Sequence, residues 1–368
     1  MSERKHDRLS GYLPRQTPLK VRDKRRMEFG SWLTEEDDYS DVIISSRIRL
    51  ARNIKGYSFP ERASDDELRR VVEKVQIGSA QSSSLRNSKE VEIRGLAEWD
   101  SKYYVERRVA SPQFAESKRP RLLVIGPREC ITLMVNEEDH LRIQCIEAGL
   151  GVNKAWRKIS ALDDELEENL NFSFSSKFGY LTSCPTNLGT GMRVSLFVHL
   201  PALTMLEQIE ETMKGLPASE IAVRGFYGEG SDSIGGIYQI SNQLTLGRAE
   251  TNIIERVMTT AKRLTELERG ARAVLATDDR VKLEDTVYRA LGVLSNARIM
   301  TSFEAMDLIS TIRLGVELGL VDIISRIAIN QLLVMVQPAH LQRIYNKSMD
   351  AEERDIARAE FIRQCLGD

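Results

Sequence analysis

Arginines stand inside the segments of this 368-residue chain that look most like β-strands. In the apolar run that begins at Val42, Arg47 and Arg49 alternate with Ile48 and Leu50. Because strand side chains point alternately to opposite faces, both guanidinium groups are expected on one face. A strand arginine is costly to bury unless an anion or a carboxylate meets it.

Three further arginines interrupt or flank apolar strand-like segments, namely Arg142, Arg193 and Arg224. Internal pairing with Asp or Glu would explain any one of the five. Together they favour a polyphosphate site, because guanidinium groups bind phosphate bidentately and remain charged.

The pattern around these arginines predicts an α/β (α+β) fold with a mainly antiparallel sheet flanked by helices. Short apolar runs predict strands, and the tight link 126–129 favours a hairpin. The strands are expected at 42–49, 122–125, 131–135, 193–200, 221–223 and 237–240, and the helices at 65–75, 155–170 and 248–276.

The character of the chain changes after residues 277–279. Apolar positions at helical spacing predict an all-helical segment, which Pro338 interrupts, with a last helix starting near Met349 or Asp350. We therefore expect a catalytic domain at 39–270 and a helical domain at 271–368. Residues 1–38 are rich in charge and are expected to be a flexible extension.

Global composition argues against several classes of protein. The 52 basic and 54 acidic residues give a net charge of -2, which offers no reason to expect nucleic-acid or membrane binding. The four cysteines form no C-x-x-C pair, so neither a zinc site nor a disulfide framework is expected. No apolar stretch could span a bilayer and no secretory signal is present, so a cytoplasmic location is expected.

Three polar segments carry candidate chemistry. The acidic turn Asn136 to His140 follows an apolar run and could hold a cation, supply a base or be a solvated turn. The loop 183–193 combines Cys184 with two glycines and a following arginine, which would let a backbone approach a ligand. The glycine-rich loop 224–230 carries Glu229, which could close over a bound cation or be an ordinary surface acid.

These blocks, in this order, resemble the guanidino (phosphagen) kinase family. The shared patterns are S-[ST]-R-[IV]-R at 45–49, N-E-E-D-H at 136–140, C-P-[ST]-N-x-G-T-G-[LM]-R at 184–193 and R-G-x-x-G at 224–228. The resemblance covers about residues 40–270 and is strongest to the family's bacterial protein-arginine kinase branch. It implies ATP and magnesium, with magnesium held mainly by ATP and not by a protein metal site.

The resemblance implies roles for individual residues. Glu138 would be the base, Glu229 the second carboxylate and Cys184 a contact of the substrate guanidinium. Nucleotide contacts are implied for Ser45, Ser46, Arg47, Ile48, Arg49, Arg108, Arg142, Arg193, Val194, Ser195, Leu196, Phe197, Arg224, Gly225, Phe226, Tyr227, Gly228 and Glu229. One position departs from the branch, since Arg108 stands where its pattern has histidine.

The substrate is expected to be an arginine side chain of a protein. Family members that act on free metabolites carry a helical domain of roughly a hundred residues before the first arginine strand, and here about forty residues precede it. The C-terminal motif Arg354, Asp355, Arg358 and Ala359 resembles the phosphoarginine pocket of the protein-arginine kinase branch, although a salt-bridged helix face is the plain alternative.

The same resemblance implies a homodimer, an McsA-like activator and delivery of marked proteins to a Clp-type protease. Two other functions remain open: a kinase for free arginine or a related guanidine, and a non-catalytic phosphoarginine-binding adaptor.

Overall fold

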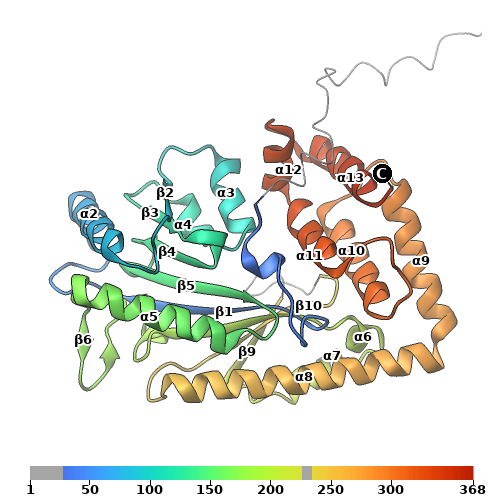
Figure 1. The fold of residues 1–368 in the computed structure, drawn as a ribbon, viewed down its shortest axis with the longest axis horizontal. Coiled ribbons are helices and arrows are strands. Elements are labelled where there is room, and N and C mark those ends of the chain that lie inside the picture. The colour runs from blue at the N-terminus through green and yellow to red at the C-terminus, as the bar shows by residue number, and fades with distance from the viewer. Residues whose placement is uncertain (1–27, 226–233, 368) are drawn as a thin grey trace, which may run out of the picture.

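One eight-stranded sheet forms the centre of the computed structural model, which describes residues 28–225 and 234–367 (Figure 1). Every pair of neighbouring strands is antiparallel, in the order β2-β3-β4-β5-β1-β8-β10-β9, so the predicted sheet is confirmed. The strands are β1 (Ile43–Arg52), β2 (Lys89–Glu92), β3 (Leu122–Ile125), β4 (Ile131–Val135), β5 (Leu141–Ala148), β8 (Met192–His199), β9 (Ile221–Arg224) and β10 (Ile237–Asn242), with a separate hairpin of β6 (Phe174–Ser175) and β7 (Gly179–Tyr180).

Two long helices cover one face of the sheet (Figure 1). In α5 (Val152–Leu170) the buried side chains Ala155, Ile159, Leu162 and Leu166 recur every three or four residues and so share one face. The second long helix is α8 (Glu250–Asp278), which runs under β8 and β10. Shorter helices complete this part: α2 (Asp65–Gln81), α3 (Glu98–Glu106), α4 (Pro112–Glu116), α6 (Pro201–Met205) and α7 (Ile209–Lys214), with 3-10 turns η1 (Ser31–Leu33), η2 (Pro127–Glu129) and η3 (Pro185–Asn187).

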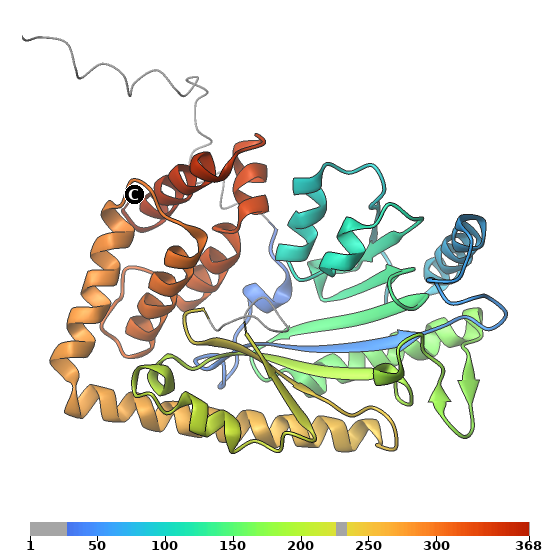
Figure 2. The ribbon, with the colours of Figure 1, turned by 180° about the vertical axis from the view of Figure 1, so that it is seen from behind.

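Five helices form the C-terminal part, as predicted for an all-helical segment. They are α9 (Arg280–Asn296), α10 (Ser302–Glu317), α11 (Arg326–Met335), α12 (Pro338–Tyr345) and α13 (Ala351–Gly367). They gather at one end of the sheet (Figure 2). The predicted interruption at Pro338 is confirmed, since α11 ends at Met335 and Pro338 is the first residue of α12, where a missing N–H costs nothing.

The helical part is joined to the sheet part through α3. The carboxylate of Glu106, at the end of α3, accepts hydrogen bonds from the N–H groups of Ala339 (2.7 Å) and His340 (2.9 Å) at the start of α12. An acid at a helix N-terminus satisfies unpaired donors and complements the helix dipole. In addition, one continuous cluster of buried apolar side chains extends from the sheet into α10 and α11.

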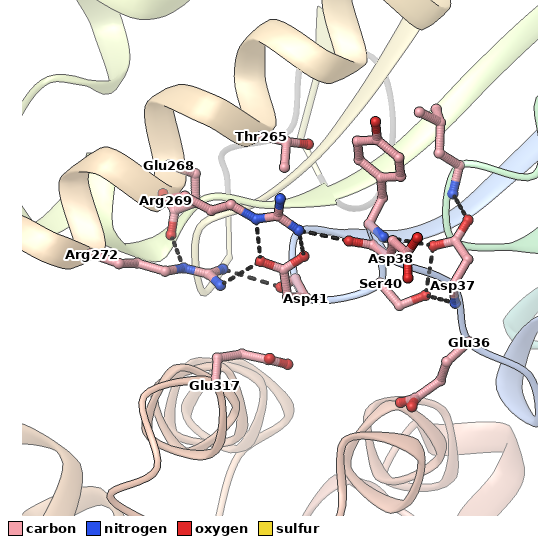
Figure 3. Close-up of polar contacts among 12 residues, drawn as sticks. Glu36, Asp37, Asp38, Ser40, Asp41, Thr265, Glu268, Arg269, Arg272 and Glu317 are labelled. Carbon is pink, nitrogen blue, oxygen red and sulfur yellow. Dashed lines mark hydrogen bonds and ion pairs between the residues drawn. The ribbon is translucent and has the colours of Figure 1, made fainter.

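A second junction connects the segment before β1 to α8 and α10. The carboxylate of Asp41 lies between Arg269 (2.6 Å) and Arg272 (3.4 Å) of α8, and Arg272 also pairs with Glu268 at 2.8 Å (Figure 3). From α10, the fully buried Arg313 donates to the carbonyls of Ser40 (2.6 Å) and Asp41 (2.8 Å). The start of β1 is thereby fixed by two distant helices.

The flexible extension predicted for residues 1–38 contains ordered structure near its C-terminal end. Within it, Ser31–Leu33 form η1, and Trp32 and Leu33 are 3% and 4% exposed because η1 packs against β5 and α11. Two bulky apolar residues in an otherwise charged stretch are the signal that the composition argument overlooked.

Candidate active site

The strand arginines meet in one cavity of about 690 Å³ on the face of the sheet opposite α5 and α8. Strand β1 lies between β5 and β8, and Arg49 is directly opposite Arg193 in the β1–β8 register. Side chains from the sheet and from the segment after α3 line the cavity, including Arg47, Arg49, Arg108, Arg142, Arg193 and Arg224. The predicted gathering of these arginines is therefore observed.

These guanidinium groups are half-buried and crowd one another. Burial, together with the nearby cations Arg108, Arg142 and Arg193, lowers the pKa of Arg47 to about 9. Burial, followed by the charges of Arg142 and Arg47, holds the pKa of Arg49 well below its usual range. A polyanion in the cavity would relieve both effects, since it replaces lost hydration and offsets like-charge repulsion.

Polar neighbours orient Arg47 without neutralising it. Its Nε donates to Ser195 Oγ and its Nη2 to Gln239 Oε1, both at 3.3 Å. Hydroxyl and amide oxygens carry no net charge, so the guanidinium keeps its full charge for a ligand. By contrast, Arg142 donates to the Glu137 carboxylate at 2.5 Å and is partly neutralised.

Arg108 lies in the cavity although it departs from the branch pattern. Its guanidinium stacks 3.6 Å from the centre of the Phe197 ring, and burial lowers its pKa to about 10. Gln144 Nε2 on β5 donates to the Arg108 carbonyl at 2.6 Å. An arginine stacked in this way presents the edge of its planar guanidinium group, which carries the N–H donors, to a ligand.

The acidic turn 136–140 presents one exposed carboxylate. Asn136 has a left-handed backbone (φ 61°) and donates to the Leu68 and Pro120 carbonyls, which shapes the turn. Glu137 is buried by Arg142 and by Ser111, whose hydroxyl donates to it at 2.6 Å. The side chain of Glu138 is exposed and accepts a hydrogen bond from Asn187 Nδ2 at 3.2 Å. The residues beside Glu138 are thus structural, and Glu138 is available to a substrate.

Asp139 ties this turn to the cysteine-containing loop. Its carboxylate accepts from Asn53 Nδ2 (2.6 Å) and from the Ser183 N–H (2.7 Å). Burial raises the pKa of Asp139 to about 6, even though both hydrogen bonds lower it. The contact places Cys184, which is half-buried and 3.0 Å from Thr186 Oγ1, in the loop that also contacts Glu138.

The two glycines of this loop serve packing. A Cβ at Gly189 (φ 105°) would lie 2.8 Å from the Thr245 carbonyl oxygen, and one at Gly191 (φ 61°) would lie 2.6 Å from that of Ala51. Both positions therefore exclude other residues because of neighbouring backbone. The structure thus gives these glycines a packing role, and their predicted approach to a ligand stays a prediction.

Several residues of the predicted nucleotide set lie elsewhere. Ser46 donates to the Gly149 carbonyl at 2.6 Å, and Ile48 and Val194 are buried in the core, so these three side chains do not line the cavity. Ser45, Ser195 and Leu196 line a small hollow that shares Arg47, Arg108 and Phe197 with the cavity. Gly225 is buried just after β9, and Phe226, Tyr227, Gly228 and Glu229 lie outside the described residues.

Sequence reasoning missed a second group of lining residues. They are Trp32, Arg121, Glu137, Gln144 and Gln239, together with Asn330, Leu333, Val334 and Gln337 of the helical part. Alternation along β5 and β10 places Gln144 and Gln239 on the arginine face and could have found them. The residues of α11 and its C-terminal turn depend on the packing of helices against the sheet, which no local pattern reports.

The C-terminal motif lies on α13, with its two arginines in different environments. Arg358 is 1% exposed, and it donates to the Val336 and Met300 carbonyls at 2.8 Å and to the Asp355 carboxylate at 2.5 Å. Arg354 is half-buried. The expectation that both arginines face a phosphoryl group together does not match this arrangement, because Arg358 is bound within the helical part.

Sequence comparison agrees with this geometry. Residues 70–271 match the family model described as ATP:guanido phosphotransferase, C-terminal catalytic domain. The chain belongs to the ATP:guanido phosphotransferase family. The prediction of an enzyme that transfers a phosphoryl group from ATP to a guanidino group is confirmed.

Residues 280–368 match a second model, the C-terminal domain of protein-arginine kinase McsB. The chain is 42% identical over 338 residues to the protein-arginine kinase of Moorella thermoacetica, covering 91% of this chain and 97% of that relative. It is 41% identical over 341 residues to that of Clostridium acetobutylicum, covering 91% and 99%. The predicted resemblance to the protein-arginine kinase branch is confirmed.

Solved structures share the fold. Lombricine kinase superposes with a TM-score of 0.57 at 21% identity, covering 68% of this chain and 74% of that one. The duplicated taurocyamine kinase of Schistosoma mansoni, with bound transition state analog components, gives 0.58 at 22% identity, covering 78% and 43%. Within the described ranges, no helix is both long and apolar enough to cross a bilayer.

Proposed function

We propose that this enzyme transfers the γ-phosphoryl group of ATP to arginine side chains of proteins. The carrying observation is a cavity in which several arginines gather, with the exposed Glu138 at its margin in contact with Asn187 of the loop that contains Cys184. The arginines suit a nucleotide polyphosphate, and the carboxylate suits a guanidinium.

Each group then has a physical task. A guanidinium has a pKa above about 12, so its nitrogen is a weak nucleophile until a base takes the proton. Glu138 orients this nitrogen and accepts the proton, while Arg47, Arg49 and Arg193 hold the phosphates in line. Magnesium bound to the ATP phosphates would supply further neutralisation of the transferring group. Glu229, outside the described residues, is proposed as the second carboxylate that holds the substrate.

The proposal of a protein substrate depends on the relatives. The relatives at 41–42% identity that cover nearly the whole chain are protein-arginine kinases, and the match extends through the helical part, whose boundary we place at Asp279. A homodimer, an McsA-like activator and a Clp-type protease that degrades the products belong to the same proposal. Regulation by phosphoarginine is assigned to Arg354 and Asp355, with Arg358 and Ala359 holding α13 in place.

A transfer assay tests the substrate. The full chain is incubated with Mg-ATP and either an unfolded protein or free arginine, and phosphoarginine is measured by mass spectrometry under conditions that preserve the P–N bond. Phosphoarginine in the protein is expected. Transfer to free arginine alone would overturn the choice of substrate, and no transfer to either would overturn the catalytic proposal.

A matched pair of variants tests the base. Glu138→Gln is expected to lower transfer by about 10³-fold and to leave the unfolding temperature unchanged, because Glu138 is exposed and, within the described part of the chain, its side chain makes one weak contact. Glu137→Gln breaks the pair with Arg142 and should instead lower the unfolding temperature. Retained activity in Glu138→Gln would contradict its role.

A further inference from the structure

Two cysteines that are distant from the proposed reaction lie together beside the sheet. Cys130 follows η2 and Cys145 lies in the middle of β5, and their Sγ atoms are 3.6 Å apart. Both are buried and unbridged, with Cys130 7% and Cys145 0% exposed. A disulfide needs about 2 Å between the sulfurs, so a movement of about 1.5 Å would join them.

A lysine and a glutamate complete this cluster. Lys158 of α5 lies 3.2 Å from Cys130 Sγ and 2.6 Å from Glu147 Oε1, and the same carboxylate oxygen lies 3.0 Å from Cys130 Sγ. An ammonium group at this distance stabilises a thiolate over a thiol. Lys154, one turn earlier on α5, binds the other oxygen of Glu147 at 2.9 Å and does not contact the sulfur.

The two thiols are therefore unequal. The hydrogen bond from Cys145 lowers the pKa of Cys130, and Lys158 also lowers it, while burial and the Glu147 carboxylate oppose this shift without cancelling it. That same hydrogen bond, together with burial, raises the pKa of Cys145. Cys130 is the better nucleophile and the more accessible sulfur, and Cys145 is positioned behind it.

We propose that Cys130 and Cys145 form an oxidation site that peroxides convert to a disulfide. The Cys130 thiolate attacks a peroxide oxygen, the O–O bond breaks, and the sulfur becomes a sulfenic acid as hydroxide leaves and takes up a proton. Cys145 then attacks Cys130 sulfur and gives its proton to Glu147, while the S–O bond breaks and the oxygen departs as water after protonation from the Lys158–Glu147 pair. Two thiols lose two electrons, and hydrogen peroxide is reduced to two waters.

The cluster favours oxidation over a bound cation. Ligand atoms of Cys130, Cys145 and Glu147 do lie within 4.8 Å of one another, a spacing that metal ligands can have. However, both carboxylate oxygens of Glu147 are already paired with lysine ammonium groups. A metal ion would have to displace two positive charges from the position it needs.

The site also adjoins the nucleotide cavity, a link that rests on the proposed function. Glu129, next to Cys130, pairs with the buried Arg107 at 2.7 Å, and the next residue is Arg108 of the cavity. A shift of Cys130 toward Cys145 would pull Glu129 and disturb this pair. Oxidation is therefore expected to weaken nucleotide binding.

Peptide mapping tests the modification without ATP. The full chain is treated with hydrogen peroxide, remaining thiols are alkylated, and non-reduced peptides are analysed by mass spectrometry. A Cys130–Cys145 cross-link that dithiothreitol reverses is expected. Oxidation of Cys184 alone, or sulfinic acid at Cys130 without a cross-link, would overturn the proposal.

Two lysine variants test the chemistry. Lys158→Met should slow cross-linking by about threefold, because the thiolate fraction falls while the remaining thiolate is more nucleophilic. Lys154→Met is the matched control on the same helix and should have a smaller effect, since it does not contact the sulfur. Equal rates in Lys158→Met and the unmodified chain would exclude the assigned role of Lys158.

Binding of a fluorescent ATP analogue tests the link to the cavity. Peroxide should reduce affinity by about fivefold in the unmodified chain and not in Cys130→Ser, which cannot form the bridge. If the disulfide forms and affinity for the ATP analogue does not change, the proposed effect of oxidation on the cavity is wrong. If the disulfide forms but the enzyme transfers no phosphoryl group, only the proposed function is contradicted.

Discussion

Arginines are buried in two regions of this molecule, and their surroundings differ. At the junction before β1, Arg313 is fully buried and donates to the carbonyls of Ser40 and Asp41, to Asn330 Oδ1 (3.0 Å) and to His199 Nδ1 (2.7 Å). In the cavity, Arg49 is half-buried, and its Nε has no hydrogen-bond partner among the described residues.

The difference separates structural arginines from ligand-binding ones. Burial lowers the pKa of Arg313 to about 10, and burial also lowers that of Arg49, so desolvation alone does not distinguish them. What differs is the neighbourhood: Arg313 is surrounded by acceptors, and the charges next to Arg49 are chiefly other arginines. A guanidinium held among like charges is unfavourable unless a polyanion joins them.

Arg49→Met gives the largest expected effect. Phosphotransfer should fall by about 10³-fold or more, because the variant loses a preorganised contact to the transferring phosphoryl group. The free energy of unfolding should not fall, since one of several repelling charges is removed. Denaturant unfolding and a transfer assay on the same preparation measure both, and a large loss of stability would remove the distinction between the two regions.

Arg313→Met is the matched change at the junction. It removes the donor from the Ser40 carbonyl, Asn330 Oδ1 and His199 Nδ1, while the Asp41 carbonyl keeps a hydrogen bond from Arg272, so the protein should lose about 3 kcal/mol or more of stability. The fraction that remains folded should retain nucleotide binding, because Arg313 does not line the cavity. Urea titration with and without an ATP analogue checks this. A variant that keeps its stability but does not bind the analogue would contradict it.

Asp139 extends the comparison to a carboxylate. Its folded-state pKa of about 6 lies above the ordinary Asp value near 4, so between these values the folded state binds more protons than the unfolded state. Stability due to this group therefore rises as pH falls from about 6 to about 4. Asp139→Asn removes the buried charge and should be more stable by about 2 kcal/mol at pH 7.

The advantage of Asp139→Asn should shrink as pH falls through about 6, because the unmodified carboxyl then also becomes neutral. Urea titrations at several pH values measure the difference. A difference that does not change with pH would show that Asp139 is charged in the folded state throughout this range.

An exposed ion pair should show the smallest effect. Arg69 and Asp66 pair on the surface of α2 with side chains 51% and 85% exposed. Arg69→Ala should change the unfolding free energy by less than about 0.5 kcal/mol, because solvent screens the pair. Thermal unfolding measures the change. If Arg69→Ala lost as much stability as Arg313→Met, side-chain exposure would not predict how much each arginine contributes to stability.

The sequence predicted the features that depend on local periodicity. Alternation of Arg47 and Arg49 with apolar residues placed both on one face of β1, and helical spacing located α5 and α8. Which residues then share a site depends on pairing register and on helix packing, which are long-range properties.

Particular residues show this limit in detail. Arg354 and Arg358 are one turn apart, but only the packing of α13 against the rest of the helical part shows that Arg358 enters the core. The acidic turn could not reveal that Glu137 pairs inward while Glu138 is exposed. Likewise, the proximity of Cys130 and Cys145 follows from the β4–β5 register, in which Ile131 pairs with Cys145.

The hydrogen bonds from Arg313 have a consequence for biosynthesis. Arg313, which donates to the carbonyls of Ser40 and Asp41, is synthesised more than 270 residues after them. Contacts that distant in the chain form slowly, because a long loop must close first. The nascent chain can therefore assemble much of the sheet during translation, but the start of its central strand gains its contacts to α8 late and those to Arg313 only when α10 has been made.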